Sequence, residues 1–442
     1  MNELPIIAIV GEPNVGKSTL MNKIAGRMFA VTSPVAGTTR DRQYVDTSWN
    51  GVGFTLVDTA GITFNEKGEL EQALNGQIDV AVDQADLLLF VADAKDGVEH
   101  IDRKTIIKFR KSKKPVVLAV NKVDSPKNVE AVAASFQSTG IKEIYPVSAL
   151  NGRGIGDLLD SIAGFITEHG LAREKEQPAR GIAVSIVGKP NVGKSSILNK
   201  ILKQDRVVVS PVPGTTRTAI DTYTTIDGQE YTFIDTAGLK KKEHRQKLPD
   251  IFSGFQTFKA LRRSDIAFLV IDATQEITKQ DQQIAREIAE LDKGVVILAS
   301  KMDLYNGTEQ ALRDYVSGHF PFLWHSPLFF VSGLTGHGID AAITALKPIF
   351  ANRHKEIPQE AIDKLLANML KQNPPKLLRD QKKPKVLGLR QSATNPPQFE
   401  LLVNYPAAIS QQFRRYALKR IMKSLDFWGT PVSLRLKGKD KK

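Results

Sequence analysis

The chain has 442 residues, which is too many for one compact core and predicts about three domains. Hydrophobic residues make up 41% and charged residues 25%, as in ordinary soluble proteins, and no apolar run approaches the roughly 20 residues of a membrane span. The absence of cysteine excludes disulfides and thiolate chemistry, and the N-terminus lacks the pattern of a signal peptide, so we expect a cytoplasmic protein without stable membrane association.

The formal net charge of +13 is concentrated near the C-terminal end. Residues 355–442 carry 19 Lys and Arg against 7 Asp and Glu, whereas residues 1–168 carry 18 against 21. A concentrated basic surface attracts polyanions, of which nucleic acid is the most common. The last fifth of the chain therefore indicates a nucleic-acid-binding surface, and a solvated lysine-rich tail is the alternative.

The first expected strand, residues 6–10, leads directly into a phosphate-binding loop. Gly11 and Gly16 enclose four residues and precede Lys17 and Ser18, which is the P-loop pattern. Glycines let backbone N–H groups curve around phosphate oxygens, the lysine ammonium neutralises the β- and γ-phosphates, and the serine hydroxyl is placed to ligate Mg²⁺. The predicted phosphate-binding residues are Asn14, Gly16, Lys17, Ser18 and Thr19.

Two switch motifs follow in the same copy. Thr38 and Thr39 come after Gly37, where a hydroxyl must meet Mg²⁺ when a triphosphate is bound, and we assign that role to Thr39. Asp58 ends an apolar strand and begins Asp-Thr-Ala-Gly, in which the carboxylate reaches the metal through water and the Gly61 N–H meets the γ-phosphate. The alternatives are a plain loop and a turn at the end of a strand.

The residue after this motif is Ile62, where Ras-like enzymes have a glutamine that orients the attacking water. An isoleucine cannot hold a water by hydrogen bonding, so another group must compensate. The amide oxygen of Asn14 could hold a monovalent cation against the bridge between the β- and γ-phosphates. Alternatively, this asparagine only braces the loop.

A base-recognition motif, Asn121-Lys122-x-Asp124, closes a later apolar strand. The Asp124 carboxylate can accept hydrogen bonds from guanine N1–H and the exocyclic amine, and adenine lacks this pair of donors. Ser148 and Ala149 are expected to supply backbone donors to the guanine carbonyl. The predicted ligands are therefore GTP and GDP.

All these motifs recur in a second copy, and the early ones lie 177 residues after their counterparts. The predicted phosphate-binding residues of the second copy are Asn191, Gly193, Lys194, Ser195 and Ser196, and Asn191 is also its cation candidate. The predicted magnesium residues are Ser18, Thr39 and Asp58 in the first copy and Ser195, Thr216 and Asp235 in the second, where Gly238 is the γ-phosphate glycine. The predicted guanine-binding residues of the second copy are Ser300, Lys301, Asp303, Ser332 and Gly333.

Two positions of the second copy depart from the first. Ser300 replaces the motif asparagine, and a serine cannot supply the amide pair that braces the base and the P-loop. We expect guanine specificity to survive through Asp303 with weaker nucleotide affinity. Gly333 replaces Ala149, and we expect a more flexible loop there.

The alternation of buried strands with helical segments predicts two consecutive Ras-like P-loop GTPase domains, each a doubly wound α/β fold with a mostly parallel sheet. The predicted boundaries are 1–168 for the first domain, 169–180 for a linker, 181–354 for the second domain and 355–442 for a small α+β domain.

The last domain has the predicted order helix (359–371), strand (385–392), strand (398–405), helix (410–425) and strand (431–437). The Gly-x-x-Gly clamp of KH domains is absent from it, so we expect RNA contact by charge and shape. The predicted RNA contacts are Arg414, Arg415 and Lys419 on its second helix, together with Lys240, Lys241 and Lys242 after the second switch motif, for which an exposed charged loop is the alternative.

The motifs PNVGKST, GTTRD, DTAG, NKxD and SAL, duplicated before a basic C-terminal domain, resemble the Der (EngA) family of bacterial GTPases over essentially the whole chain. The resemblance implies a role in assembly of the large (50S) ribosomal subunit, binding to ribosomal RNA, K⁺-stimulated hydrolysis without a glutamine, and a KH-like third domain. Mg²⁺ and K⁺ are the expected cofactors, and we expect a monomer.

Three other functions remain open on the residues alone. A regulatory nucleotide-binding module with one inactive site shares the same motifs. A GTPase linked to tRNA modification also lacks the glutamine, but it predicts a partner catalytic domain with a reactive cysteine, which this chain does not have. A membrane-remodelling GTPase is disfavoured, because no long amphipathic segment is evident.

Overall fold

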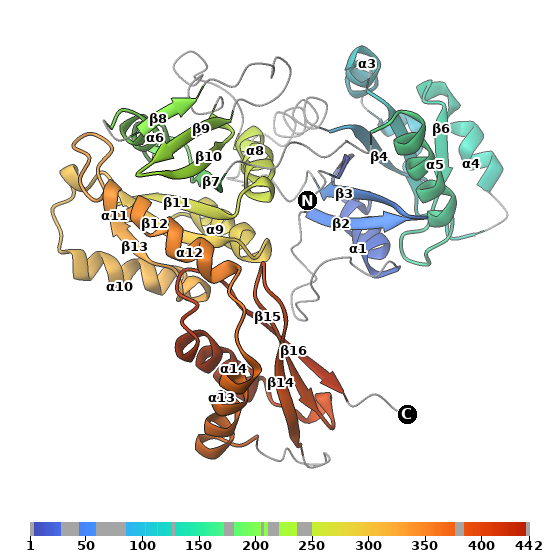
Figure 1. Ribbon diagram of the computed structural model, residues 1–442. Coiled ribbons are helices and arrows are strands. Elements are labelled where there is room, and N and C mark those ends of the chain that lie inside the picture. Colours follow the sequence, from blue (N-terminus) through green and yellow to red (C-terminus); the bar gives the residue numbers. More distant parts are fainter. Residues whose placement is uncertain are drawn as a thin grey trace. The chain divides into compact units, whose positions relative to one another are not determined.

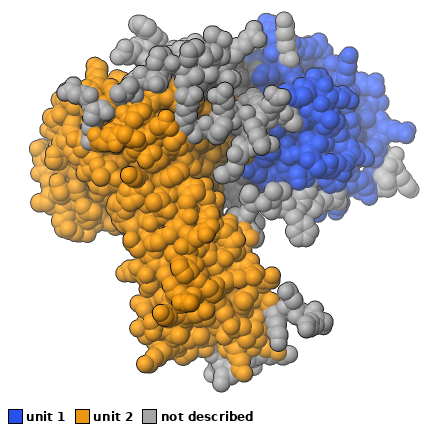
Figure 2. Space-filling view, in the orientation of Figure 1, with its two compact units in different colours: residues 1–178, 247–255 blue, residues 179–246, 256–442 orange. Residues whose placement is uncertain are grey.

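The computed structural model describes most of the chain, namely residues 4–27, 44–58, 85–101, 103–112, 114–125, 129–171, 181–204, 207–210, 221–236, 250–375 and 384–438. The chain divides into two compact units, residues 1–178 with 247–255 and residues 179–246 with 256–442 (Figure 2). The first boundary between the two units lies between residues 178 and 179, which is inside the segment 169–180. Among the described residues, no helix has the length and apolar character needed to cross a membrane.

The first unit is built on a six-stranded sheet in the order β2-β3-β1-β4-β5-β6. Neighbouring strands are parallel except β2 and β3, which pair antiparallel. Every residue of β1 and β4 is buried, as expected of central strands that are covered on both faces. The strands are β1 (Ile6–Val10), β2 (Tyr44–Trp49), β3 (Val52–Asp58), β4 (Leu87–Asp93), β5 (Val116–Asn121) and β6 (Glu143–Pro146).

Helices cover both faces of this sheet (Figure 1). One core contains side chains of α1 and α5, and a second core, formed from the alternate residues of the same strands, contains Phe109 of α3. The helices are α1 (Lys17–Arg27), α3 (Arg103–Ser112), α4 (Val129–Ser135) and α5 (Ile155–Glu168), with short 3₁₀ turns at Val98–His100 and Gln137–Thr139. The predicted doubly wound α/β fold is confirmed.

The second unit repeats this architecture in a seven-stranded sheet, ordered β13-β12-β11-β7-β10-β9-β8. Strands β8, β9 and β10 pair antiparallel, and the remaining neighbours are parallel. The strands are β7 (Ile182–Val187), β8 (Val207–Ser210), β9 (Thr222–Ile226), β10 (Gln229–Ile234), β11 (Ile266–Asp272), β12 (Gly294–Ser300) and β13 (Leu328–Phe330). The edge strand β8 has no counterpart among the described residues of the first unit, because the corresponding residues 30–33 lie outside them.

The helices of this repeat again lie on both faces of the sheet (Figure 1). They are α6 (Lys194–Leu202), α8 (Asp250–Arg263), α9 (Lys279–Glu290), α10 (Glu309–His319), α11 (Ile339–Thr344) and α12 (Leu346–Arg353), with 3₁₀ turns at Met302–Leu304 and Pro321–Leu323. A capping box begins α9, because the Thr278 side chain accepts from the Asp281 N–H while the Asp281 carboxylate accepts from the Thr278 N–H.

The C-terminal part has the predicted order α-β-β-α-β. It consists of α13 (Gln359–Gln372), β14 (Val386–Ala393), β15 (Gln398–Val403), a 3₁₀ turn at Pro406–Ala408, α14 (Gln411–Ser424) and β16 (Ser433–Gly438). Its three strands pair in the order β14-β15-β16, and β15 alternates buried and half-buried residues because helices cover one face. Phe413 and Ile421 of α14 are buried in its core.

This last domain is joined to the second GTPase-like repeat by hydrogen bonds within one unit. Val295 of β12 donates its N–H to the Gly429 carbonyl (3.0 Å), and Gly429 donates its own N–H to the His325 carbonyl (3.0 Å). The buried Arg353 at the end of α12 donates to the Asp292 carbonyl (2.7 Å) and to the Asn395 side chain (3.1 Å). The basic domain is therefore packed on the second repeat.

Candidate nucleotide-binding sites

The first P-loop connects β1 to α1 at the carboxyl edge of the sheet. The ammonium of Lys17 donates to the carbonyl oxygens of Gly11 (2.9 Å) and Glu12 (2.7 Å). Burial lowers the pKa of Lys17, and the carboxylates of Asp58 and Glu12 oppose that effect. A lysine drawn across its own loop and desolvated in this way is placed to exchange carbonyl oxygens for phosphate oxygens. The other predicted phosphate-binding residues, Gly16, Ser18 and Thr19, lie at the start of α1.

The second P-loop connects β7 to α6 with the same geometry. Lys194 donates to the carbonyl oxygens of Gly188 (2.6 Å) and Lys189 (2.5 Å), and Gly193, Ser195 and Ser196 lie at the start of α6. In both loops the asparagine has a left-handed backbone, with φ of 65° at Asn14 and 64° at Asn191. Asparagine is one of the few residues that adopt this conformation readily, so the backbone of the loop by itself favours asparagine at these positions, in addition to the predicted cation role.

The predicted magnesium residues of the first site lie side by side. Ser18 donates its hydroxyl to Asp58 Oδ2 at 2.6 Å, although 40 residues separate them. A hydroxyl and a carboxylate, both oxygen donors, suit the preference of Mg²⁺. In the second site, Ser195 lies in the first turn of α6 and Asp235 follows β10 with φ of 53°. The predicted residues Thr39, Gly61, Thr216 and Gly238 lie outside the described part of the chain.

The base-recognition residues of the first site form one hydrogen-bonded group. Asn121 donates from Nδ2 to the Val15 carbonyl in the P-loop (2.8 Å) and accepts at Oδ1 from the Ala149 N–H (2.9 Å). Ser148 donates its hydroxyl to Asp124 Oδ1 (2.7 Å), whereas its N–H donates to the Arg153 carbonyl (3.0 Å). The role visible for Ser148 is thus to orient the carboxylate that is predicted to recognise guanine.

The second site keeps part of this arrangement. Ser332 donates its hydroxyl to Asp303 Oδ1 at 2.5 Å, as Ser148 does to Asp124. Ser300 donates to the Val192 carbonyl (2.5 Å) and approaches the Ile271 carbonyl (2.9 Å). Ser300 does not supply the amide pair of the first site, but its short side chain at the end of β12 still reaches the P-loop. We call Ser148 and Ala149, and their counterparts Ser332 and Gly333, the base loops. Among the described residues, Ser300 forms no hydrogen bond to its base loop like the one from the Ala149 N–H to Asn121.

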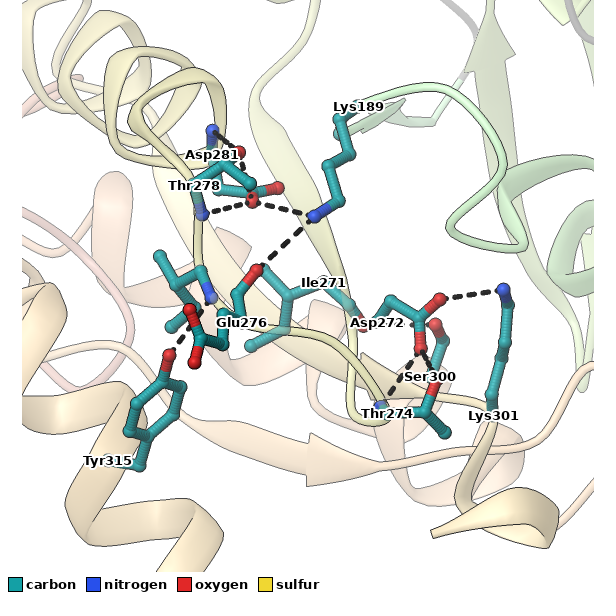
Figure 3. A network of polar contacts seen from close by, with 12 residues as sticks. Lys189, Ile271, Asp272, Thr274, Glu276, Thr278, Asp281, Ser300, Lys301 and Tyr315 are labelled. Atoms are coloured by element: carbon teal, nitrogen blue, oxygen red, sulfur yellow. Dashed lines mark hydrogen bonds and ion pairs between the residues drawn. The ribbon is translucent and has the colours of Figure 1, made fainter.

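Sequence reasoning missed two aspartates that hold the lysines of the base motifs. Lys122 forms an ion pair with Asp93, the last residue of β4, and Lys301 forms one with Asp272, the last residue of β11, at 2.6 Å (Figure 3). Burial favours the neutral acid at Asp272, but the hydrogen bonds from Lys301 and Thr274 outweigh it and the pKa is lowered. The sequence feature that could have identified them is the aspartate that ends each of these apolar strands.

A further residue that sequence reasoning missed lies in the P-loop itself. Lys189 Nζ is 3.2 Å from Asp281 Oδ2 at the start of α9 and 3.4 Å from the Glu276 carbonyl (Figure 3). The two side chains are 11% and 2% exposed, so this is a buried ion pair. The first copy has the exposed Glu12 at the corresponding position. The second P-loop is therefore anchored to α9 through a charge that the first loop lacks.

The predicted RNA contacts are placed only in part. Lys240, Lys241 and Lys242 lie outside the described residues. On α14, Arg415 and Lys419 are exposed, and the ammonium of Lys419 lies 5.9 Å from the centre of the Trp324 ring. Arg414 is half-buried and donates to the Leu434 carbonyl (2.8 Å), so its guanidinium also holds α14 against β16.

The whole chain is similar to known proteins. Residues 6–122 and 183–301 match a family described as a 50S ribosome-binding GTPase, and residues 356–437 match the KH-domain-like C-terminal domain of EngA bacterial GTPase enzymes. Relatives named GTPase Der are 36% identical in Protochlamydia amoebophila (100% of this chain, 90% of the relative) and 38% identical in Desulforudis audaxviator (99% of each).

Solved structures match part of the chain. A crystal structure of an Era variant from Aquifex aeolicus bound to GDP and AlF₄⁻ has a TM-score of 0.29 at 24% identity, covering 57% of this chain and 91% of that one. The FeoB G-domain of Methanococcus jannaschii has a TM-score of 0.28 at 22% identity, covering 38% and 99%.

Proposed function

Since the chain belongs to the Der (EngA) family of bacterial GTPases, we propose that it is a GTP-hydrolysing switch that acts in maturation of the large ribosomal subunit. The observation that carries the proposal is the packing of a strongly basic domain on the second of two P-loop repeats. Its residues 355–442 carry 19 Lys and Arg against 7 Asp and Glu. A nucleotide-dependent change in that repeat therefore acts next to an RNA-binding surface.

The chain's own residues supply binding and orientation at each site. Lys17 and Lys194 meet the phosphates, Asp124 and Asp303 accept from the guanine edge, and the hydroxyls of their serine partners orient those carboxylates. Ser18 and Asp58, together with Ser195 and Asp235, would hold Mg²⁺. When bound, this ion stabilises charge on the β- and γ-phosphate oxygens.

The attacking water needs a partner that neither Ile62 nor Leu239, which follows Gly238 in the second copy, provides. We propose that K⁺, held in part by the amide oxygens of Asn14 and Asn191, offsets charge near the bridge between the β- and γ-phosphates. Both asparagines are exposed and have a left-handed backbone. Replacing K⁺ by Na⁺ should therefore slow hydrolysis more than it weakens nucleotide binding.

The proposed partner is ribosomal RNA of the large subunit, reached through phosphate contacts of the basic domain. The exposed Arg415 and Lys419 on α14 support this assignment. Binding through phosphates is salt-dependent, and each lost contact reduces the slope of log affinity against log salt by about 1. We propose a monomeric protein that acts in the cytoplasm, where it meets assembling subunits.

The test is sedimentation of the purified chain with 50S subunits in a non-hydrolysable GTP analogue, in GDP and without nucleotide. Each condition is measured in K⁺ and in Na⁺. We expect cosedimentation to depend on the nucleotide and to weaken in Arg415→Glu with Lys419→Glu. Equal cosedimentation in all three nucleotide conditions, or binding to 30S subunits in preference to 50S, would overturn the proposal while leaving GTP hydrolysis intact.

A further inference from the structure

The two repeats connect the base loop to the P-loop in different ways. In the first repeat the amide of Asn121 spans both, donating to the Val15 carbonyl and accepting from the Ala149 N–H. In the second repeat Ser300 has a single hydroxyl hydrogen, and its partners are the carbonyls of Val192 and Ile271. In the part of the chain that the structure describes, no hydrogen bond joins this serine to the base loop.

The base loop of the second repeat instead lies against α6. A Cβ on Gly333 would be 2.8 Å from Ser196 Cβ and 3.0 Å from the Ile197 nitrogen. Backbone atoms and a Cβ of the first helical turn cannot move aside without shifting the helix, so a methyl group does not fit. The first repeat has the buried Ala149 at this place. The second base loop thus lies closer to its helix than an alanine permits.

The P-loop shows the matching difference. A Cβ on Gly16 would overlap the Asn121 amide, whereas a Cβ on Gly193 would lie 3.7 Å from the Ser300 hydroxyl, which is ordinary van der Waals contact. The serine therefore leaves space beside the P-loop that the asparagine fills in the first repeat. Ser300 therefore lies beside the P-loop, and Gly333 lies beside the first turn of the helix that follows it.

We propose that Ser300 and Gly333 are a matched pair of positioning residues that set guanine recognition in the second site. Loss of the amide removes one link between the loops, and the glycine lets close packing on α6 replace it. The base loop carries Ser332, whose hydroxyl holds Asp303 at 2.5 Å, so the seating of this loop determines where the base-recognising carboxylate lies. This inference rests on the proposed use of the second site for guanine nucleotides.

The pairing predicts that the two substitutions are not additive. Gly333→Ala alone forces the loop away from α6, and overpacking of this kind should weaken GDP binding by about tenfold. Ser300→Asn alone should change affinity by about threefold or less, because the space beside Gly193 accepts the amide. In the double variant the amide can reach the displaced loop as Asn121 reaches Ala149, so GDP affinity should return to within about threefold of the parent.

The experiment is calorimetric titration of the full chain with GDP and with inosine diphosphate, which lacks the exocyclic amine. All variants carry Asp124→Asn, so that the first site no longer accepts guanine and only the second is measured. We expect Gly333→Ala to lower the preference for GDP over inosine diphosphate and the double variant to restore it. Unfolding temperatures measured without nucleotide separate the general cost of overpacking in Gly333→Ala, which should lower the temperature, from the specific change in GDP preference.

The first site provides the reciprocal test without any risk of overpacking. In a chain carrying Asp303→Asn, we expect Asn121→Ser to weaken GDP binding and added Ala149→Gly to recover part of the loss. Additive effects in both repeats, or an unchanged GDP affinity in Gly333→Ala, would overturn the pairing. If the Asp124→Asn parent bound no GDP at all, the nucleotide site proposed for the second repeat would itself fail, which is a different result from additivity.

Discussion

Replacing Lys189 by methionine tests how the second P-loop is held. Methionine keeps the length of the side chain but removes the ammonium that lies 3.2 Å from Asp281 Oδ2. Breaking a buried ion pair from one side costs about 3–5 kcal/mol, because the remaining charge is left without a partner. Asp281 retains two hydrogen bonds from Thr278, at 2.8 and 2.7 Å, so we expect a smaller loss of unfolding free energy, about 2 kcal/mol.

The same substitution should also speed release of nucleotide from the second site. The carbonyl oxygen of Lys189 is a partner of the Lys194 ammonium at 2.5 Å, so a loosened loop loosens the phosphate-binding lysine with it. We expect release of a fluorescent GDP analogue to be about tenfold faster, measured by stopped flow in a chain whose first site carries Asp124→Asn. Urea denaturation of the same protein gives the loss of stability.

The matched control is Glu12→Met in the first P-loop. Glu12 is exposed, and substitutions of this kind usually change stability by less than about 0.5 kcal/mol. Lys189→Arg keeps the positive charge and should retain most of the stability. The reasoning is refuted if Lys189→Met denatures at the same urea concentration as the parent and releases GDP at the same rate.

Three further predictions concern other parts of the molecule. Ser148→Ala and Ser332→Ala remove the hydroxyls that orient Asp124 and Asp303, and each should lower the preference for GDP over inosine diphosphate at its own site by about fivefold in competition binding. Ser18→Ala should abolish the Mg²⁺ dependence of GTP affinity at the first site, measured by titration with and without the ion, and an undiminished dependence would contradict the assignment of the Ser18–Asp58 pair. Burial raises the pKa of Glu287 from 4.5 to about 8, so the folded chain binds this proton more tightly than the unfolded chain, and stability should fall as pH rises through that range. In urea denaturation across pH, Glu287→Gln should remove this dependence, stabilising the protein by about 3–5 kcal/mol at pH 8 and by little below pH 4.5.

Much of the fold could be predicted because its signals are local. The apolar runs that became β1 and β4 lie next to turn and loop residues, so strand, loop and helix can be located without knowing the tertiary structure. The third domain was predictable for the same reason, since the observed α13 is one residue longer than expected and α14 is one residue shorter at each end. Two copies of each motif made chance matches improbable.

The base motifs show where such reasoning stops. Their carboxylates Asp124 and Asp303 could be assigned from chemistry, since only an acceptor pair recognises the guanine edge. The partners of those carboxylates could not, because Ser148 and Ser332 are 24 and 29 residues away along the chain. Nothing local distinguishes a serine that orients a carboxylate from one that offers its backbone to the base.

The sequence by itself determined that this protein has two P-loop repeats and a basic α+β domain, and it predicted that both sites select guanine, because motif residues of fixed spacing carry that chemistry. Only the tertiary structure decided how each site is braced. Ser300 reaches Val192 across 108 residues, and Lys189 reaches Asp281 across the end of β11. Such contacts depend on distances between separate strands and helices, which packing of the sheet sets to within a methyl group, as the space at Gly333 shows.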